Sequence, residues 1–324
     1  MATVGATREP GLRVYCTHFD SRYAARGLTM LRSLRRQDPS AHLVVAALDS
    51  LTHRIVHDQL GAEVTLLATR DLLEIEPRLE RLRGRSAYER YGTQKPVVPR
   101  LAFERLKDAS CAVWIDADTM FFSSPASMFD EIGDASVGLS PHRFHEGTAH
   151  LWRCGTFNAG CVYWRNDPVG RRCLRDWGDD CLTWCLDQID FGGRFMNQGY
   201  LNRWPKRYPE VHVIRHPGVN LAPWNIDGHA VEAHGDSVRI DGAPLVFYHF
   251  SLVEQDDAGR WYSRHPNPRR DLDVAMNRIY APYIAGVEAT QSAIAKGYPV
   301  EDTAPLRARA AEVHYIPLPG SRGA

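Results

Sequence analysis

A short apolar run ends in two closely spaced carboxylates in the stretch Cys111-Ala-Val-Trp-Ile-Asp-Ala-Asp-Thr-Met-Phe-Phe-Ser-Ser-Pro125. The run from Cys111 to Ile115 has the composition of a buried parallel strand. Asp116 and Asp118 follow where the run stops being apolar. Side chains two residues apart on a strand share one face. We therefore expect both carboxylates to face one crevice at the carboxyl end of the sheet, where open α/β proteins bind ligands.

Two hard oxygen ligands on one side suit Mg²⁺ or Mn²⁺ holding a diphosphate. An Asp-x-Asp pair is a weak signal by itself, because aspartate is also common at the beginning of helices and turns, and here Pro125 follows. The metal-site interpretation therefore depends on other residues of the chain.

Composition places the chain among globular proteins and excludes several classes of partner. Its 324 residues suffice for one large α/β domain or two ordinary ones. Lys+Arg and Asp+Glu both number 39, so the net charge gives no field that would attract nucleic acid or an anionic membrane. No apolar run approaches the ~18–20 residues of a membrane span. Residues 1–11 lack the apolar core of a signal peptide and are expected to form a loose tail.

The seven cysteines favour buried, reduced thiols over a disulfide framework, because their number is odd and several lie within apolar runs. We therefore expect a cytoplasmic protein. Cys181 and Cys185 are four residues apart on a predicted helix and could hold a metal. No second Cys or His pair matches them, which favours packing in the core.

Strands and helices alternate in the first third of the chain. The sequence predicts strands at 12–16, 42–48 and 63–67, a loop at 17–23, a helix over 24–37 with an apolar stripe, and a second helix ending at Gly61. This alternation predicts a right-handed, doubly wound half domain. The loop after the first strand has no Gly-x-Gly-x-x-Gly, which argues against a dinucleotide cofactor.

The remainder of the chain offers further strands and several polar side chains beside them. We expect helices through Leu106, over 168–186 and around 272–283, strands at 136–140, 161–164 and 244–251, and a loop over the site at 142–151. Lys95 and Arg100 lie near the start of the first of these helices and could reach a phosphate, or they are ordinary surface residues.

Asn158 offers a donor and an acceptor to sugar hydroxyls, or it is a turn residue. His249 ends an apolar run, either as a satisfied core residue or as a third metal ligand.

Six motifs, in order, resemble retaining GT-A-fold glycosyltransferases that use nucleotide sugars, in particular bacterial relatives of the glycogenin and galactosyltransferase (family-8-like) group. The resemblance covers about residues 14–251. The matching motifs are Thr17-His-Phe-Asp-Ser-Arg-Tyr23, Trp114-Ile-Asp-Ala-Asp-Thr-Met-Phe-Phe122, Phe157-Asn-Ala-Gly160, Asn197-Gln-Gly-Tyr-Leu-Asn202, Asn220-Leu-Ala-Pro-Trp-Asn225 and His249-Phe-Ser251.

The resemblance implies an α/β fold: a GT-A-type, Rossmann-like mixed sheet flanked by helices in a single catalytic domain. That domain would span residues 12–262, with a nucleotide-binding half at 12–125 and an acceptor-side half at 126–262. Residues 263–324 would form a helical extension and tail. The implied activity is metal-dependent transfer, with retention, of a sugar from a nucleoside diphosphate. UDP is the expected carrier, Mn²⁺ or Mg²⁺ the expected metal, and the hydroxyl of a small molecule the preferred acceptor.

The resemblance also implies roles for individual residues. Asp116, Asp118 and His249 would hold the metal. The donor would contact Thr17, Asp20, Tyr23, Lys95, Asp116, Ala117, Asp118 and Asn158, with Tyr23 stacking on the base. Asn158 and Gln198 would face the donor sugar and its anomeric carbon, and Asn197 would hydrogen-bond the sugar or the acceptor. The alternative is that Asn197 and Gln198 cap the helix through Leu201.

This chain departs from the family pattern in two places. Many relatives have an acidic residue where this chain has Asn197, and an amide cannot act as a carboxylate nucleophile. This difference favours attack from the front face of the sugar. Relatives often follow the His-Phe-Ser motif with Gly and a phosphate-binding Lys, whereas this chain has Leu252, Val253 and Glu254. Another Arg or Lys would have to take the place of that lysine.

Two other functions remain open at this point. A sugar-1-phosphate nucleotidyltransferase shares the general sheet architecture, but its glycine- and arginine-rich loop is absent from residues 17–23. A non-catalytic nucleotide-sugar-binding protein is disfavoured by the retention of Asp116, Asp118 and His249 together, while Asn197 is compatible with it. The sequence also leaves open whether the chain forms a homodimer.

Overall fold

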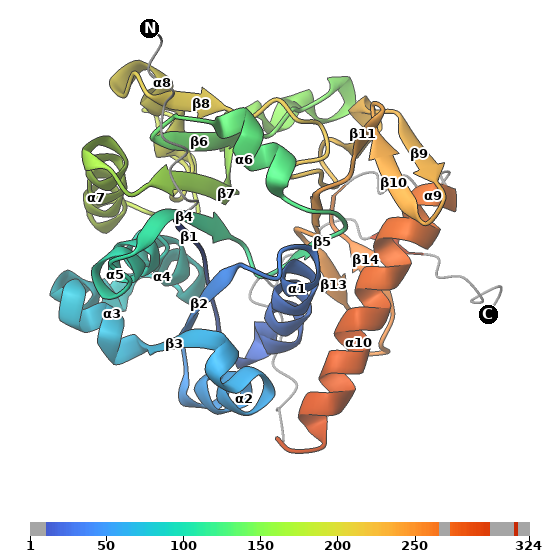
Figure 1. Cartoon of the computed structure of the whole chain (residues 1–324), viewed down its shortest axis with the longest axis horizontal. Coiled ribbons are helices and arrows are strands. Elements are labelled where there is room, and N and C mark those ends of the chain that lie inside the picture. Colours follow the sequence, from blue (N-terminus) through green and yellow to red (C-terminus); the bar gives the residue numbers. More distant parts are fainter. Residues whose placement is uncertain (1–10, 266–272, 299–313, 317–324) are drawn as a thin grey trace, which may run out of the picture.

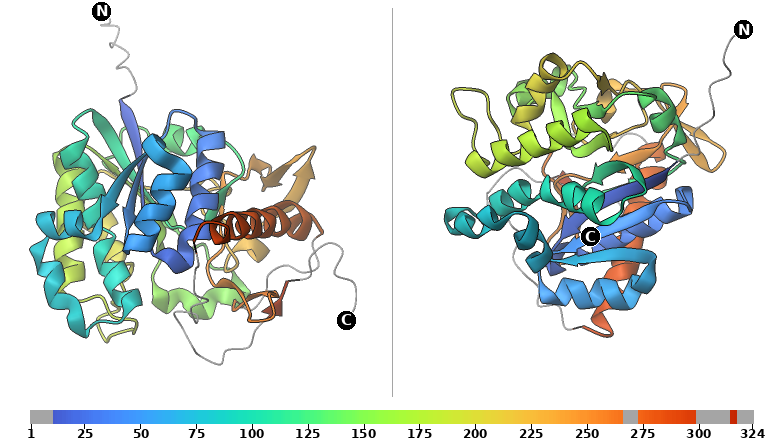
Figure 2. Two further views of the ribbon diagram at one scale, coloured as in Figure 1. Left: turned by 90° about the horizontal axis from the view of Figure 1, so that it is seen from below. Right: turned by 60° about the vertical axis from the view of Figure 1, so that its left-hand side comes forward.

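The computed structural model describes residues 11–265, 273–298 and 314–316. Its centre is a seven-stranded sheet in the order β3-β2-β1-β4-β7-β6-β8. Strands β3, β2, β1 and β4 are parallel neighbours, and β7 runs antiparallel to both β4 and β6. Helices cover both faces of this sheet (Figures 1 and 2). The predicted α/β fold, a mixed sheet flanked by helices, is confirmed.

The first half contains the parallel strands in the predicted order. Its elements are β1 (Leu12–Phe19), α1 (Ala24–Gln37), β2 (His42–Ala47), α2 (Ser50–Leu60), β3 (Val64–Ala68), α3 (Thr69–Ile75), α4 (Ala87–Gln94), α5 (Val97–Arg105) and β4 (Ala109–Ile115). Strand β1 is longer than predicted, because Thr17 to Phe19 continue the ladder with Val45 to Ala47 of β2. The predicted loop at 17–23 is therefore wrong for its first three residues, and residues Ser21–Tyr23 form a 3-10 turn.

The second half adds antiparallel strands and the elements that carry the site. They are β5 (Thr119–Phe121), α6 (Ala126–Ile132), β6 (Val137–Pro141), β7 (Phe157–Arg165), α7 (Pro168–Thr183), α8 (Trp204–Arg207), β8 (Val211–Val213) and β12 (Phe247–His249). The region predicted as a loop at 142–151 instead contains part of a 3-10 helix over Glu146–Cys154. At its beginning the His145 N–H donates to the Thr148 hydroxyl oxygen. The strand predicted at 244–251 is shorter, because β12 pairs only with the three residues of β5.

The C-terminal elements form two small sheets and the long helix α10. They are β9 (Val231–His234), β10 (Ser237–Ile240), β11 (Ala243–Pro244), β13 (Val253–Gln255), β14 (Trp261–Ser263), α9 (Asp273–Ala275), α10 (Ala281–Ala295) and β15 (His314–Tyr315). Helix α10 lies along α1 (Figure 1), where Thr29 and Thr290 hydroxyls meet at 3.2 Å. The predicted tail at 1–11 lies almost entirely outside the described residues, as does much of the predicted extension at 263–324.

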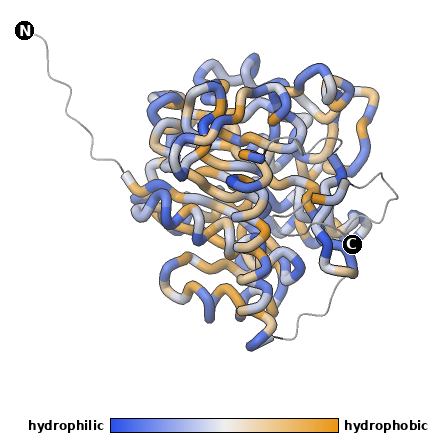
Figure 3. The backbone as a smooth tube through the Cα atoms, turned by 90° about the vertical axis from the view of Figure 1, so that its right-hand side faces the viewer, coloured by the Kyte–Doolittle hydropathy of each residue, from blue (hydrophilic) through white to orange (hydrophobic). Residues whose placement is uncertain are grey.

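Two apolar clusters occupy the two faces of the sheet. One includes Leu28 of α1 and Ile55 of α2, and the other includes Leu101 of α5 and Trp177 of α7. Figure 3 shows the central strands mostly in the hydrophobic colour. All seven cysteines are free and six are buried, and Cys181 and Cys185 pack in the second cluster as expected.

None of the helices in the described ranges combines the length and the apolar character of a membrane span.

Candidate active site

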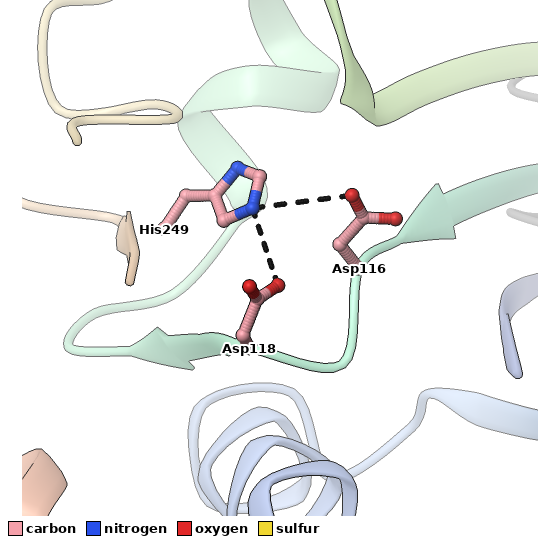
Figure 4. A group of neighbouring side chains, drawn as sticks. All are labelled: Asp116, Asp118 and His249. Carbon is pink, nitrogen blue, oxygen red and sulfur yellow. Dashed lines mark ion pairs between the residues drawn. The ribbon is translucent and has the colours of Figure 1, made fainter. Parts of the chain in front are cut away.

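The two carboxylates of the Asp-x-Asp motif lie in the turn that joins β4 to β5. The Asp116 N–H donates to Gly160 O at 2.9 Å, and the Thr119 hydroxyl donates to Asp116 O at 3.0 Å. These bonds fix the turn so that both carboxylates point toward His249 at the end of β12 (Figure 4). The expectation that they face one side is confirmed, although a turn rather than a continuous strand places them.

The ligand atoms of Asp116, Asp118 and His249 lie within 4.8 Å of one another. His249 Nε2 is 3.2 Å from Asp118 Oδ1 and 3.9 Å from Asp116 Oδ2. Ligands that are each about 2.1 Å from one Mg²⁺-sized ion lie about 3–4 Å apart, so these separations fit a shared cation. Two carboxylates and one imidazole also suit Mn²⁺ or Mg²⁺ rather than a thiophilic metal.

Two donors hold the other oxygen of Asp116. The indole N–H of Trp114 donates to Asp116 Oδ1 at 2.7 Å, and the Lys95 ammonium lies 2.6 Å from the same oxygen. Lys95 also donates to Ala159 O at 3.3 Å and lies over the Trp114 ring at 5.4 Å. This arrangement leaves Asp116 Oδ2 directed at His249. Lys95 is therefore within the site, at the break between α4 and α5.

The charges of Asp118 and His249 stabilise each other. Burial raises the pKa of Asp118, but the charge of His249, its hydrogen bond and the charge of Arg26 together leave that pKa below its usual value. Burial lowers the pKa of His249, but Asp118 and Asp116 outweigh it, so the pKa of His249 is raised. The two carboxylates therefore favour the protonated form of His249 more than water does.

Gly160 provides the space in which the His249 ring lies. A Cβ added at Gly160 would lie 2.6 Å from His249 Cε1 and 2.5 Å from Asn158 Oδ1. The ring nitrogen on that side, His249 Nδ1, is buried and has no hydrogen-bond partner in the described part of the chain. On this side the ring is held by packing against β7 and by the T-shaped contact with Trp224, whose ring centroid is 5.3 Å away.

The residues expected around the nucleoside lie where β1 ends. Asp20 is engaged within its own turn: Tyr91 OH donates to Asp20 Oδ2 at 2.7 Å, and Arg22 Nε donates to the same oxygen at 2.8 Å. The Thr17 hydroxyl is buried and has no hydrogen-bond partner among the residues that the structure describes. The Tyr23 ring faces the guanidinium of Arg26, 4.9 Å from its centroid.

Asn158 belongs to a buried amide network. His142 Nδ1 bonds Gly155 O at 2.8 Å, which requires this nitrogen to carry the proton, so His142 Nε2 accepts from Asn158 Nδ2 at 3.2 Å. Asn158 Oδ1 accepts from Gly160 N at 2.8 Å and from Asn220 Nδ2 at 3.2 Å. Most of the hydrogen-bonding capacity of Asn158 is thus committed to the protein.

Asn197 and Gln198 follow Met196, a non-glycine residue with a φ of 47°. Asn197 Nδ2 donates to Gly92 O at 3.0 Å, and Gln198 Nε2 donates to Cys154 O at 2.8 Å. Gln198 is the residue that precedes the 3-10 helix Gly199–Arg203, but its side chain makes no capping hydrogen bond. The amides therefore connect this turn to neighbouring segments instead of capping the helix. Neither side-chain carbonyl oxygen has a hydrogen-bond partner among the described residues.

Sequence reasoning missed several residues that shape the site. Trp114 lies two residues before Asp116, so the same alternation that paired the aspartates could have identified it. The hydrogen bond from Tyr91 to Asp20 joins residues that are 71 positions apart, and no pattern near either residue predicts it. Glu254, at the position of a departure from the family pattern, accepts from Tyr262 OH at 2.8 Å and forms an ion pair with Arg264 at 2.8 Å.

Comparison with known proteins identifies relatives along most of the chain. No protein-family model matches it. The uncharacterized protein YfnF of Bacillus subtilis (strain 168) is 30% identical over 267 residues, covering 80% of this chain and 87% of YfnF. YfnD of the same organism is 28% identical over 278 residues, covering 84% of this chain and 88% of YfnD. The chain belongs to the YfnF family.

Solved structures similar to this YfnF-family chain include galactosyltransferase LgtC in complex with donor and acceptor sugar analogs, with 16% identity and a TM-score of 0.49. That similarity covers 89% of this chain and 98% of LgtC. Mouse xyloside xylosyltransferase 1 in its apo form has 14% identity and a TM-score of 0.45, covering 74% of this chain and 98% of the mouse chain.

Proposed function

We propose that this chain is a metal-dependent glycosyltransferase that moves a sugar from a nucleoside diphosphate, with UDP as the expected carrier, to a hydroxyl of a small-molecule acceptor. The observation that carries the proposal is the convergence of Asp116, Asp118 and His249, with ligand atoms within 4.8 Å, at the carboxyl end of the sheet. The six motifs that resemble GT-A glycosyltransferases support the same reaction.

Asp116, Asp118 and His249 would hold Mn²⁺ or Mg²⁺. When bound, such a cation supplies positive charge to the departing diphosphate. Trp114 and Lys95 orient Asp116, because both donate to its Oδ1. Lys95 would also lie beside the diphosphate or the donor sugar.

Thr17, Asp20 and Tyr23 would line the nucleoside pocket, with Ala117 and Asn158 beside the donor. Thr17 supports this role with a buried hydroxyl that has no protein partner. A ligand hydrogen bond would remove the cost of leaving that group unsatisfied.

Asn197 and Gln198 would lie beside the anomeric centre. Both use their amide N–H groups on backbone carbonyls, so the free carbonyl oxygens would face the sugar. A carbonyl oxygen stabilises positive charge at the anomeric carbon without forming a covalent intermediate. This arrangement is compatible with front-face attack and retention.

The test is to incubate the full chain with Mn²⁺ and a panel of UDP-, GDP-, CDP- and dTDP-sugars while measuring release of the nucleoside diphosphate, with and without acceptor alcohols. We expect release with one carrier, and loss of release in EDTA and in Asp118→Ala. Asp130→Ala, at an exposed position of α6, is the matched control and should keep full activity.

Full activity in EDTA would refute metal dependence. Nucleotide-sugar binding without release would instead support a non-catalytic binding protein. Conversion of the nucleotide sugar and added pyrophosphate into a nucleoside triphosphate and a sugar 1-phosphate would support the nucleotidyltransferase.

A further inference from the structure

Arg26 lies in the first turn of α1 with its guanidinium between two aromatic rings. The guanidinium carbon is 4.9 Å from the Tyr23 ring centroid and 5.7 Å from that of Trp261. Both distances are within the range of a cation–π contact. The five N–H donors of the guanidinium have no hydrogen-bond acceptors within the described part of the chain.

The surroundings keep Arg26 charged. Burial lowers the pKa of Arg26, but Tyr283, Tyr23, Asp118 and Glu254 outweigh it and raise that pKa. Arg26 in turn helps to lower the pKa of Asp118, after burial and the stronger influence of His249. The guanidinium is therefore close enough to the candidate metal ligands to interact with them through charge.

Neither neighbouring acid forms an ion pair with Arg26. Asp118 directs Oδ1 to His249 at 3.2 Å, and Glu254 directs Oε2 to Arg264 and Tyr262. The Arg26 guanidinium is therefore left without an ion-pair partner among the described residues, although two acids lie near it. A guanidinium whose N–H groups have no protein acceptor can donate two parallel hydrogen bonds to the oxygens of a phosphate group, and here it would do so beside the candidate metal site.

We propose that Arg26 binds the diphosphate of the donor, its N–H groups donating to phosphate oxygens from the α1 side of the site while Tyr23 and Trp261 hold the plane of the guanidinium. The inference rests on the proposed function, since it needs a nucleoside diphosphate in this crevice. Figure 4 shows the loop of Asp116 and Asp118 with a helix of the first half beneath it, and α1 is tied to β5 by the bond from Phe121 N to Ser33 Oγ at 3.0 Å. A cation on α1 would thus complement the metal.

The alternative is that Arg26 only fills the space between the two rings. Arg26→Met distinguishes the two roles, because methionine keeps an apolar stem between the rings and removes the charge and all the donors. Arg36→Met, at an exposed position of the same helix, is the matched control.

The experiment is calorimetric titration of the full chain in Mn²⁺ with UDP, GDP, CDP and dTDP, followed by the nucleoside of the diphosphate that binds best. We expect Arg26→Met to weaken diphosphate binding at least tenfold, equivalent to about 1.4 kcal/mol. Binding of the nucleoside and of Mn²⁺ should change less than twofold. Arg36→Met should match the wild type for all three ligands.

Equal weakening of nucleoside and diphosphate, or no weakening of either, would overturn the role of Arg26. If Arg26→Met does not fold, Arg26→Lys decides, because lysine keeps the charge but lacks the planar fork: we expect a selective loss of diphosphate affinity of several-fold, and an unchanged affinity would overturn the inference. A wild-type chain that binds none of the four diphosphates would refute the proposed function itself, which is a separate outcome.

Discussion

Trp114 donates its indole N–H to Asp116 Oδ1 at 2.7 Å, so a side chain near the end of strand β4 fixes the orientation of the first carboxylate of the candidate site. Lys95 bonds the same oxygen from the junction of α4 and α5. One oxygen of Asp116 is thus held by the protein, and Oδ2 is left to face His249. Groups that orient a metal ligand in this way commonly affect metal affinity.

Trp114→Phe should lower Mn²⁺ affinity about tenfold, the scale on which loss of such a supporting hydrogen bond acts. The matched control is Trp164→Phe, because Trp164 is equally buried but its indole N–H faces the Cys173 thiol and no carboxylate of the candidate site. Both variants should lose similar packing energy, while only Trp114→Phe should affect Mn²⁺ titrations. Equal Mn²⁺ affinities in the two variants would show that Asp116 needs no such support.

Gly160→Ala should displace His249, because the new Cβ would lie 2.6 Å from its Cε1 atom and 2.5 Å from Asn158 Oδ1. Contacts this short cannot be kept, and the neighbouring strands leave the ring little room. We expect Mn²⁺ affinity to fall by more than about tenfold, by analogy with other disturbances around a metal ligand. Gly84→Ala is the control, since a Cβ there would meet nothing within 4 Å. Wild-type Mn²⁺ affinity in Gly160→Ala would argue against His249 as a ligand.

Asn197→Asp should reduce stability and should not raise turnover. The Asn197 amide donates to Gly92 O at 3.0 Å, and a carboxylate there would place two acceptors against each other in a buried position. We expect the free energy of unfolding in denaturant to fall by about 1–3 kcal/mol. Asn202→Asp is the control, because Asn202 uses its oxygen to accept from Thr156 N, and a carboxylate preserves that bond.

Gln198→Ala should lower turnover markedly while donor affinity is largely kept. In the proposed function the Gln198 carbonyl oxygen stabilises positive charge at the anomeric carbon, and alanine has no such oxygen. A large gain of turnover in Asn197→Asp, or a glycosyl adduct trapped at that position, would contradict front-face attack.

The fold should lose stability as the pH falls from about 6.5 toward 3, partly through His142. Burial, the largest influence, lowers the pKa of His142 to about 3, whereas an unfolded histidine titrates near 6.5. In this window the unfolded state binds a proton that the folded state does not, so acid favours unfolding by up to about 1.4 kcal/mol per pH unit for one such group. His18 behaves alike, since burial also lowers its pKa to about 3.

His142→Asn should reduce the pH dependence of the unfolding free energy by about one proton between pH 4 and 6. His150→Asn, at an exposed position, should leave the slope unchanged. Denaturant titrations at several pH values measure both slopes. An unchanged slope in His142→Asn would mean that this imidazole is protonated in the folded protein.

Local pattern was enough to predict the framework of this protein. Period-3.6 apolar spacing identified α1 at its observed bounds, Ala24–Gln37, because one face of that helix must be buried against the sheet. The end of the apolar run at Asp116 marked the carboxyl edge of β4, where the two carboxylates lie. Those predictions depend on neighbours in sequence, and the structure confirms them.

Only the tertiary structure decided how the candidate site is held. The bond from Asn197 to Gly92 crosses 105 residues, and the contact of Arg26 with Trp261 joins α1 to a strand near the end of the chain. Such pairs carry no periodic signal, because their positions follow from how separate elements pack and not from the spacing of residues along either one. The sequence by itself therefore determined the α/β framework and the residue types of the candidate metal site. Packing determined which donors these side chains receive, and it left Arg26 without a hydrogen-bond acceptor among the described residues.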